Sequence, residues 1–191
     1  MQSQSYSWLT WPLIICAVIV LAAFTIGGKY NSLIRGNESV NAQWAQVESQ
    51  YQRRMDLIPN LVASVQGVMK QETSVFTAIA DARTRYAGAT TPDDKAAAAG
   101  QVETSLGRLL VVMENYPQLK SADTVQSLMA ELSGTENRVA VERQRYNDMV
   151  RDYNVSVQTF PGSFVASMFG FKTRTMFQAQ TGAENAPKVN L

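Results

Sequence analysis

The sequence predicts an all-α protein in which an N-terminal membrane helix is followed by a domain of packed helices. Residues 8–26 form an apolar stretch of about the length that crosses a bilayer as a helix. After Lys29, apolar residues recur at intervals of three and four, the period of a helix with one buried face. No stretch of the sequence alternates at period two, so we expect no sheet.

The apolar stretch has the features of an uncleaved membrane anchor. Trp11 near one end and Tyr30 at the other stand where interfacial aromatic residues are expected. Residues 1–11 contain no lysine or arginine, whereas a cleaved signal peptide begins with a positively charged region. Lys29 and Arg35 follow the span closely. The positive-inside rule therefore predicts an inner-membrane protein with a short N-terminus outside and its C-terminal domain in the cytoplasm.

Four helical segments are expected after the anchor, at about 30–56, 59–87, 93–115 and 122–160. Gly88 and the cap-then-proline order of residues 91–94 separate the second from the third. The turn NYPQLKSADT (115–124) precedes the fourth, which stops at Pro161. Heptad-like stripes predict shallow packing angles, as in bundles and coiled coils. The stripe residues are Val40, Trp44, Val47, Tyr51, Met55 or Arg54, Ile58, Val62, Val65, Met69, Glu72, Phe76, Ile79, Arg83, Tyr86, then Val102, Leu106, Leu109, Met113, Tyr116, then Val125, Leu128, Leu132, Thr135, Val139, Glu142, Tyr146, Met149, Tyr153, Val157 and Phe160.

The stretch RRMDLIPNLV (53–62) leaves two alternatives open. The apolar period continues across Pro59, which suits one long helix, although an interior proline costs about 3 kcal/mol. A turn at 56–60 gives segments that pair more evenly in length, with Asp56 as the cap of the next helix. Periodicity favours the turn only slightly.

We divide the chain into a tail and anchor (1–28), a helical domain (29–160) and a C-terminal tail (161–191). The tail begins with FVASMFGF (164–171), which is apolar but too short to span a bilayer. This segment can fold back on the domain, lie against lipid or dock on a neighbouring subunit. We expect residues 181–191 to be a loose end.

Composition excludes several function classes. Seventeen Lys and Arg nearly balance sixteen Asp and Glu, so no net positive field exists to bind nucleic acid. The chain has no histidine, and its single cysteine, Cys16, lies in the apolar stretch. The domain therefore lacks the usual general base, thiol nucleophile and thiolate ligands. A glycine-rich phosphate loop and a Gly-x-Ser-x-Gly motif are also absent, so we expect no enzyme, no cofactor and no metal site.

A family resemblance covers nearly everything after the anchor. It is carried by YNSL (30–33), Trp44, RRMDLIPNLV (53–62), Glu72, Arg83, LGRLLVVMENYPQLK (106–120), LMAELSGTENRVAVERQRYNDMV (128–150), YN (153–154) and FPGSFVA (160–166). At these residues the chain resembles the LemA family of bacterial membrane-anchored helical proteins. The resemblance implies an up-and-down four-helix bundle and favours a turn at 56–60, but it implies no activity. VQGVMKQE (65–72) departs from the family, which commonly has an aromatic residue and a histidine before the glutamate.

Polar residues on the apolar stripes are the candidate sites. Glu72 and Arg83 on the second segment, and Thr135 and Glu142 on the fourth, must find partners or face a groove, because unpaired burial is costly. For the helix interiors we favour an arginine–glutamate network that sets helix register; for the turn residues we favour a subunit interface. The candidates are Arg53, Arg54, Asp56, Pro59, Asn60, Glu72, Arg83, Glu114, Tyr116, Pro117, Glu136, Arg138, Glu142, Arg143, Tyr146 and Asn147. We expect Asn60, Asn115, Asn147 and Asn154 to make capping and turn hydrogen bonds.

The function expected from this chemistry is association. We expect a scaffold or adaptor whose helical domain forms a homo-oligomer, with other inner-membrane proteins as a second class of partner and lipid in contact with residues 8–28. The alternative is a coiled-coil module that transmits a signal across the membrane to a cytoplasmic partner.

Overall fold

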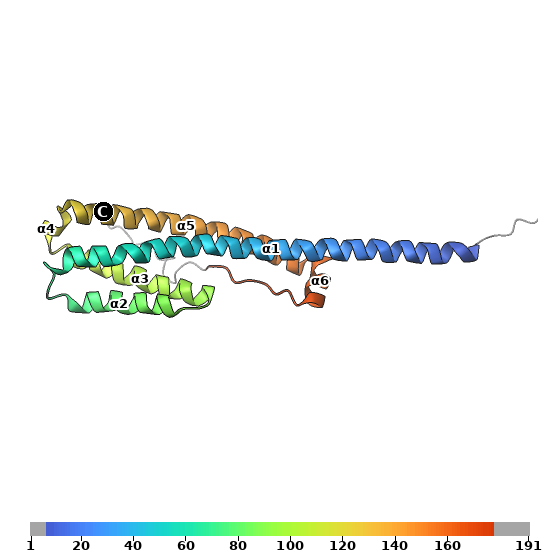
Figure 1. Cartoon of the computed structure of the whole chain (residues 1–191), viewed down its shortest axis with the longest axis horizontal. Helices are drawn as coiled ribbons and strands as arrows, with labels where there is room; N and C mark the ends of the chain where they lie inside the picture. The colour runs from blue at the N-terminus through green and yellow to red at the C-terminus, as the bar shows by residue number, and fades with distance from the viewer. Residues whose placement is uncertain (1–6, 178–191) are drawn as a thin grey trace, which may run out of the picture. The chain divides into compact units, whose positions relative to one another are not determined.

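The computed structural model describes residues 7–177, apart from the side chains of 7–10 and Lys120, and its regular secondary structure there is all helical. The helices are α1 (Ser7–Gln66), α2 (Thr73–Gly88), α3 (Pro92–Met113), α4 (Pro117–Lys120), α5 (Asp123–Gln158) and α6 (Gly162–Phe169) (Figure 1). No strand occurs between residues 7 and 177, so the predicted all-α class is confirmed. The expected loose end at 181–191 and the first six residues lie outside the described part.

The N-terminal part of α1 is the candidate membrane segment. Among the described residues, α1 is the one helix long and apolar enough to cross a membrane. Residues 11–25 are all exposed, including Leu21 and Phe24, and so have no protein partner for their apolar surface. A helix that is hydrophobic all round and unburied is typical of a bilayer span.

The expected turn at residues 56–60 is wrong. Helix α1 continues through Pro59 to Gln66, and the chain turns at residues 67–72 instead. Pro59 is exposed, whereas Ile58, Leu61 and Val65 are fully buried on the opposite side. Burying each such side chain contributes about 1.5–3 kcal/mol, which together outweighs the roughly 3 kcal/mol cost of the proline. The alternative, one long helix through Pro59, is the one observed, and this helix ends at Gln66.

The chain forms two compact units. The first contains Met1–Asn41 and Asp148–Arg174, and the second contains Ala42–Asn147 and Thr175–Leu191. Both α1 and α5 contribute residues to each unit.

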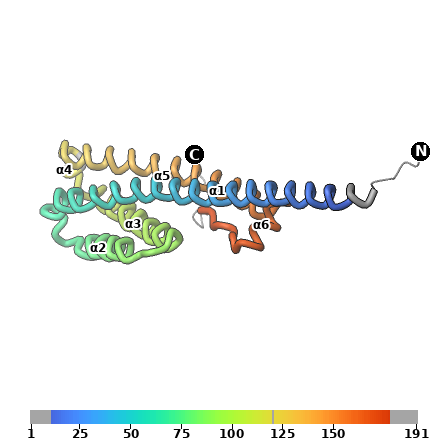
Figure 2. Tube along the Cα trace, turned by 45° about the vertical axis from the view of Figure 1, so that its right-hand side comes forward, coloured from blue at the N-terminus to red at the C-terminus, as the bar shows by residue number. Residues whose placement is uncertain are grey.

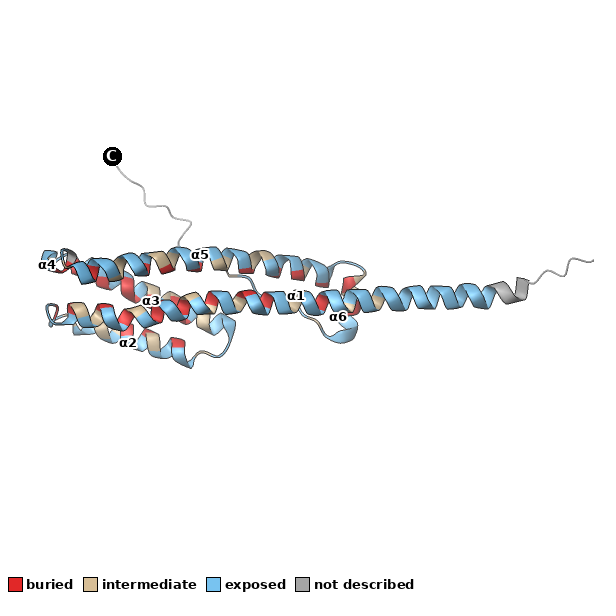
Figure 3. Ribbon diagram, turned by 45° about the horizontal axis from the view of Figure 1, so that its top comes forward, coloured by how far each residue is buried: buried red, intermediate tan, exposed pale blue. Residues whose placement is uncertain are grey.

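The core of the second unit lies between α1, α2, α3 and α5. In Figure 3 the buried residues of these helices lie on the sides that face one another. The apolar stripes supply most of this core, including Val47 on α1, Ile79 on α2, Leu109 on α3 and Val139 on α5. On α1 the predicted stripe was wrong at Val62: Leu61 is buried there, and Val62 is only half-buried.

The first unit packs α6 and the end of α5 against α1 (Figure 2). Two glycines make this packing possible. A Cβ on Gly36 would lie 3.1 Å from the ring of Tyr153, so α1 and α5 approach closely there. A Cβ on Gly162 would lie 2.0 Å from the backbone oxygen of Ser156, which only glycine avoids. The apolar period also shifts near this end, because Val150 is buried and Met149 is exposed.

Candidate functional site

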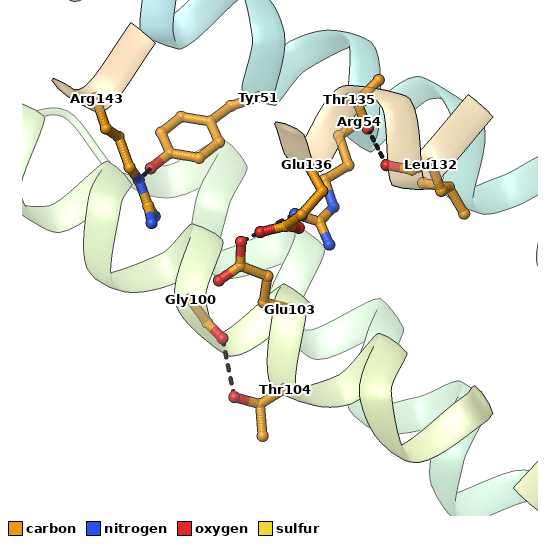
Figure 4. Close-up of polar contacts among 9 residues, drawn as sticks. All are labelled: Tyr51, Arg54, Gly100, Glu103, Thr104, Leu132, Thr135, Glu136 and Arg143. Carbon is orange, nitrogen blue, oxygen red and sulfur yellow. Dashed lines mark hydrogen bonds and ion pairs between the residues drawn. The ribbon is translucent and has the colours of Figure 1, made fainter. Parts of the chain in front are cut away.

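Arg54 is a charged side chain buried inside the second unit, with 8 % of its surface exposed. Its Nη1 donates a hydrogen bond to Oε1 of Glu103 at 2.9 Å and another to Oε2 of Glu136 (Figure 4). We call these three side chains the Arg54 cluster. The cluster joins α1, α3 and α5 through one guanidinium, because the planar fork of arginine can bind two carboxylates at once.

The helical period explains why Arg54 is buried. Tyr51, Arg54, Ile58, Leu61 and Val65 follow one another at steps of three and four along α1, and all five are buried. Arg54 therefore occupies a seam position at which most helices carry an apolar residue. A buried charge at such a position needs partners, and the two glutamates supply them.

The electrostatics of the cluster centre on Glu103. Burial raises the pKa of its carboxyl, and the charge of Glu136 and a hydrogen bond with Glu136 raise it further. The positive charges of Arg54 and Arg143 partly oppose these effects. Glu103 therefore takes up a proton more readily than an isolated glutamate does.

A second polar contact lies beside the cluster. Nε of Arg143 donates a hydrogen bond to the hydroxyl of Tyr51 at 2.7 Å. The guanidinium carbon also lies 5.4 Å from the ring centre of Phe177, within the range of a cation–π contact. Burial raises the pKa of Tyr51, while the Arg143 charge lowers it. The Tyr86 ring, 6.0 Å from that of Tyr51, has its pKa raised to about 12 by burial.

Two asparagines of α5 bind the segment that follows α6. In the second unit, Asn147 accepts a hydrogen bond from the Phe177 backbone N–H at 2.8 Å and donates one to the Phe177 carbonyl at 3.0 Å. In the first unit, Asn154 does the same with Arg174, at 2.8 and 2.9 Å. The expectation that these two asparagines make capping and turn bonds is therefore wrong. The amide group of asparagine has an NH2 that donates and an oxygen that accepts, so it can bind the C=O and the N–H of one backbone residue together.

Aromatic contacts complete the attachment of Phe177. Its ring centre lies 5.7 Å from that of Trp44 and 5.1 Å from that of Tyr146. Trp44 and Tyr146 also contact each other at 5.8 Å. Tyr146, a candidate from the sequence, is thus part of an aromatic cluster, and apolar burial combines there with the asparagine contact.

The structure realises only part of the expected arginine–glutamate network. Arg54 and Glu136 pair as described, and Glu142 accepts a hydrogen bond from buried Gln43 at 2.6 Å while pairing with Arg145 at 2.8 Å. Thr135 is fully buried but donates to the Leu132 carbonyl of its own helix at 2.7 Å. Glu72 and Arg83 are half-buried and form no ion pair within the described residues, so they do not belong to the network.

The candidates near residue 56 lie on the surface of α1 rather than in a turn. Arg53 pairs with Glu131 at 2.9 Å, and both side chains are about half exposed. Asp56 accepts a hydrogen bond from Gln52 at 2.9 Å. Pro59 and Asn60 are exposed. Surface pairs of this kind contribute little to stability, so a role for these residues at a subunit interface stays a prediction.

The remaining candidates lie on α5 and at the end of α3. Arg138 is exposed on α5. Glu114 caps α3, Tyr116 precedes α4 and is half-buried, and Pro117 is the first residue of α4, as its fixed φ favours.

Glu103, the carboxylate with the raised pKa, was not among the candidate residues predicted from the sequence. Glu103 lies one position from Val102 and three from Leu106, at the edge of the stripe on α3. The same displacement of one position relates Arg54 to Met55. On both helices a charged residue stands next to an apolar residue of the stripe, and this pattern could have indicated a buried charge. The pattern does not show which charges pair.

An apolar groove runs beside the Arg54 cluster on the same unit. One hollow of about 260 Å³ is lined by Arg54, Leu106, Leu132 and Glu136 among others. A second, of about 440 Å³, continues from it, because Leu110 and Met129 line both. We call this the α3–α5 groove. Beside it, Leu110 and Val111 are 38 % and 67 % exposed. No group of three His, Cys, Asp or Glu residues suited to a metal ion occurs in the described part.

Comparison with known proteins gives a consistent result. The model of the LemA family matches residues 43–191. The magnetosome protein MamQ 2 of Paramagnetospirillum magneticum is 28 % identical over 90 % of this chain and 74 % of its own length. MamQ of Magnetospirillum gryphiswaldense is 28 % identical over 88 % of this chain and 72 % of its own length. Protein LemA of Metamycoplasma hominis is 22 % identical over 82 % of this chain and 72 % of its own length. The chain therefore belongs to the LemA family.

Proposed function

We propose that this chain is a non-enzymatic, single-pass inner-membrane protein that acts as a scaffold by self-association of its helical domain. In this proposal α1 crosses the membrane with its N-terminus outside. The helices α1, α2, α3 and α5 form an up-and-down bundle in the cytoplasm, and other inner-membrane proteins are a second class of partner. The orientation is supported by Lys29 and Arg35, which follow the span.

The observation that carries the scaffold proposal is the α3–α5 groove. Its lining is mainly apolar; Leu110, which lines it, is exposed, and so is Val111, the next residue of α3. Exposed apolar surface next to a groove is typical of a protein interaction site. Anchoring in a membrane would also concentrate copies of the chain in two dimensions, so that modest contacts become effective.

The absence of a recognisable reaction centre supports the same proposal. Among the described residues, the side chains of the Arg54 cluster bind one another and buried Thr135 binds backbone, whereas the buried Tyr86 hydroxyl has no hydrogen-bond partner. The paired groups set helix register rather than present a nucleophile or base to a substrate.

Light scattering on the full-length protein in detergent tests self-association. We expect a mass above that of one chain, rising with concentration. The double variant Leu110→Glu/Val111→Glu should lower this mass, because it places two charges on the exposed apolar surface. Arg108→Glu on the same helix is the matched control, since it is exposed and changes the net charge by the same amount. A monomer at every concentration would contradict the proposal.

A second candidate function, signal transmission, is supported by the continuity of α1. This helix runs without a break from the candidate membrane segment into the second unit. A helix of this kind could pass a rotation or shift to a cytoplasmic partner. Replacing the first seven residues with an unrelated polar sequence should abolish function in a sensor and leave a scaffold intact.

A further inference from the structure

We infer that α6 is an interfacial membrane anchor: the outer face of α6, formed by Phe164 and Met168, and Phe160, which leads into α6, lie in the lipid surface beside α1. This inference rests on the proposed membrane crossing of α1, and it adds a second membrane contact made by a different part of the chain. The partner is the lipid of the bilayer itself, at the boundary between acyl chains and headgroups.

The position of α6 in the first unit supports this inference. The Tyr30 ring centre lies 4.7 Å from that of Phe169 and 5.9 Å from that of Phe171. Tyr30 follows Ile26, the last residue of the apolar stretch, by four residues, or about 6 Å of helix. The C-terminal end of α6 therefore lies at the level where the candidate membrane segment ends, which is where interfacial aromatic residues occur.

The two faces of α6 differ in burial but not in polarity. Val165 and Ala166 are buried against the rest of the unit, at 1 % and 3 % exposure. On the outer face, Phe164 and Met168 are 53 % and 55 % exposed, and Phe160, which leads into α6, is 86 % exposed. An outer surface made of two phenylalanines and a methionine is unsuited to water and suited to a lipid surface.

The structure holds this face in place on both sides. Gly162 allows the chain to enter α6 directly against the Ser156 carbonyl. Gly170, in the left-handed region at φ 77°, ends α6, and the Phe171 N–H donates to the Ala166 carbonyl at 3.0 Å. Asn154 then holds the following segment at Arg174. The aromatic face is thus presented by a fixed helix.

The charges around α6 match an anionic lipid surface. Lys29, Arg35 and Lys172 are exposed in this unit. No acidic residue occurs in the sequence before Glu38 or between residues 153 and 183. Within residues 7–41 and 148–174, five Lys and Arg outnumber the three acidic residues, Glu38, Asp148 and Asp152, and Asp152 lines the same hollow as Arg35. The unit therefore carries a net positive charge, as membrane-surface segments do.

A second copy of the chain suits the same face less well. Three partly exposed side chains offer roughly 400 Å² of surface, against about 800 Å² per partner in a standard protein interface. Two copies meeting here would also bring their positive charges together. Lipid satisfies both the apolar face and the charges.

Site-directed spin labelling of the full-length protein tests the inference. In a Cys16→Ala background, the label is placed by Phe164→Cys, and in a second protein by Met168→Cys, so that one misfolded variant does not decide the result. Val141→Cys, an exposed apolar position on α5 in the second unit and outside the α3–α5 groove, is the matched control. The proteins are reconstituted in vesicles of phosphatidylethanolamine and phosphatidylglycerol. Collision with oxygen, which concentrates in lipid, is compared with collision with a water-soluble nickel complex.

We expect the oxygen-to-nickel ratio to be several-fold higher at positions 164 and 168 than at 141, at every protein-to-lipid ratio. Equal ratios in protein that floats with the vesicles would overturn the interfacial anchor while leaving the membrane crossing of α1 intact. Protection of the labels from the nickel complex that appears only at a high protein-to-lipid ratio would also overturn the inference, because a second copy of the chain would then cover the face. Protein that does not float with the vesicles would overturn the membrane crossing and this inference together.

Discussion

The substitution Arg54→Met tests whether the buried arginine holds α1, α3 and α5 together. Methionine keeps a long, flexible side chain at the seam position but removes the guanidinium that bridges Glu103 and Glu136. The two carboxyl groups would then remain close together without the cation between them. We expect a lower free energy of unfolding at neutral pH.

The expected size follows from the burial of each partner. Removing one member of a buried ion pair costs about 3–5 kcal/mol when both charges are well buried. The Glu103 side chain is 17 % exposed, but that of Glu136 is 44 % exposed and is partly screened by water. We therefore expect a loss of about 2–3 kcal/mol.

The loss should depend on pH. Burial and Glu136 already raise the pKa of Glu103, and removing Arg54 raises that pKa further, because a cation that lowered it is gone. Protonation of Glu103 relieves the repulsion between the two carboxylates. The difference between variant and wild type should thus be largest above the folded pKa of Glu103 and shrink as the pH falls towards 4.5, its ordinary value.

Urea unfolding of the full-length protein in detergent, followed by circular dichroism between pH 4.5 and pH 8, measures both effects. Arg53→Met is the matched control, because the neighbouring arginine lies on the same helix but makes an exposed ion pair. We expect the control to lose less than about 1 kcal/mol. Equal losses in the two variants, or a loss from Arg54→Met that does not change with pH, would refute the assignment of Arg54 as a buried bridge.

Three further outcomes follow from single contacts. Glu103→Gln mimics the protonated carboxyl. In the wild type, the stability that this group contributes is present below pH 4.5 and is lost as the pH rises through its raised folded pKa. In urea unfolding, the free energy of unfolding of the variant should therefore increase relative to that of the wild type as the pH rises. Gly162→Ala should lower the free energy of unfolding, because its Cβ would lie 2.0 Å from a backbone oxygen. Gly134→Ala, where the Cβ would meet open space, should raise the free energy of unfolding by up to about 1 kcal/mol. Asn147→Ala should speed hydrogen exchange of the Phe177 amide, to which Asn147 is bonded, without changing the helix content; an unchanged rate would contradict the contact.

Local signals predicted much of the secondary structure. Thr91 caps α3 by accepting a hydrogen bond from the Asp94 N–H at 3.1 Å, and Pro92 is the first residue of the helix. Gly88 ends α2 as expected. These boundaries were predictable because caps and prolines act through neighbours within a few residues, so their effect does not depend on the rest of the fold.

The turn after α1 was mispredicted because its position depends on tertiary packing. Locally, Pro59 opposes a continuous helix. The burial of Ile58, Leu61 and Val65 reverses that preference. The apolar period across Pro59 indicated that apolar residues share one face of a helix, but not how completely other helices bury that face.

By itself the sequence determined the helical class, the candidate membrane segment and the apolar face of each helix, because these depend on residue periods within a single helix. Only the tertiary structure decided the partners of the polar residues. Arg54 meets Glu103 and Glu136 from positions 49 and 82 residues away, and Asn147 meets Phe177 from 30 away. A period shows which side of a helix is buried, but the register between helices, set by the packing of the whole core, selects which charges meet there.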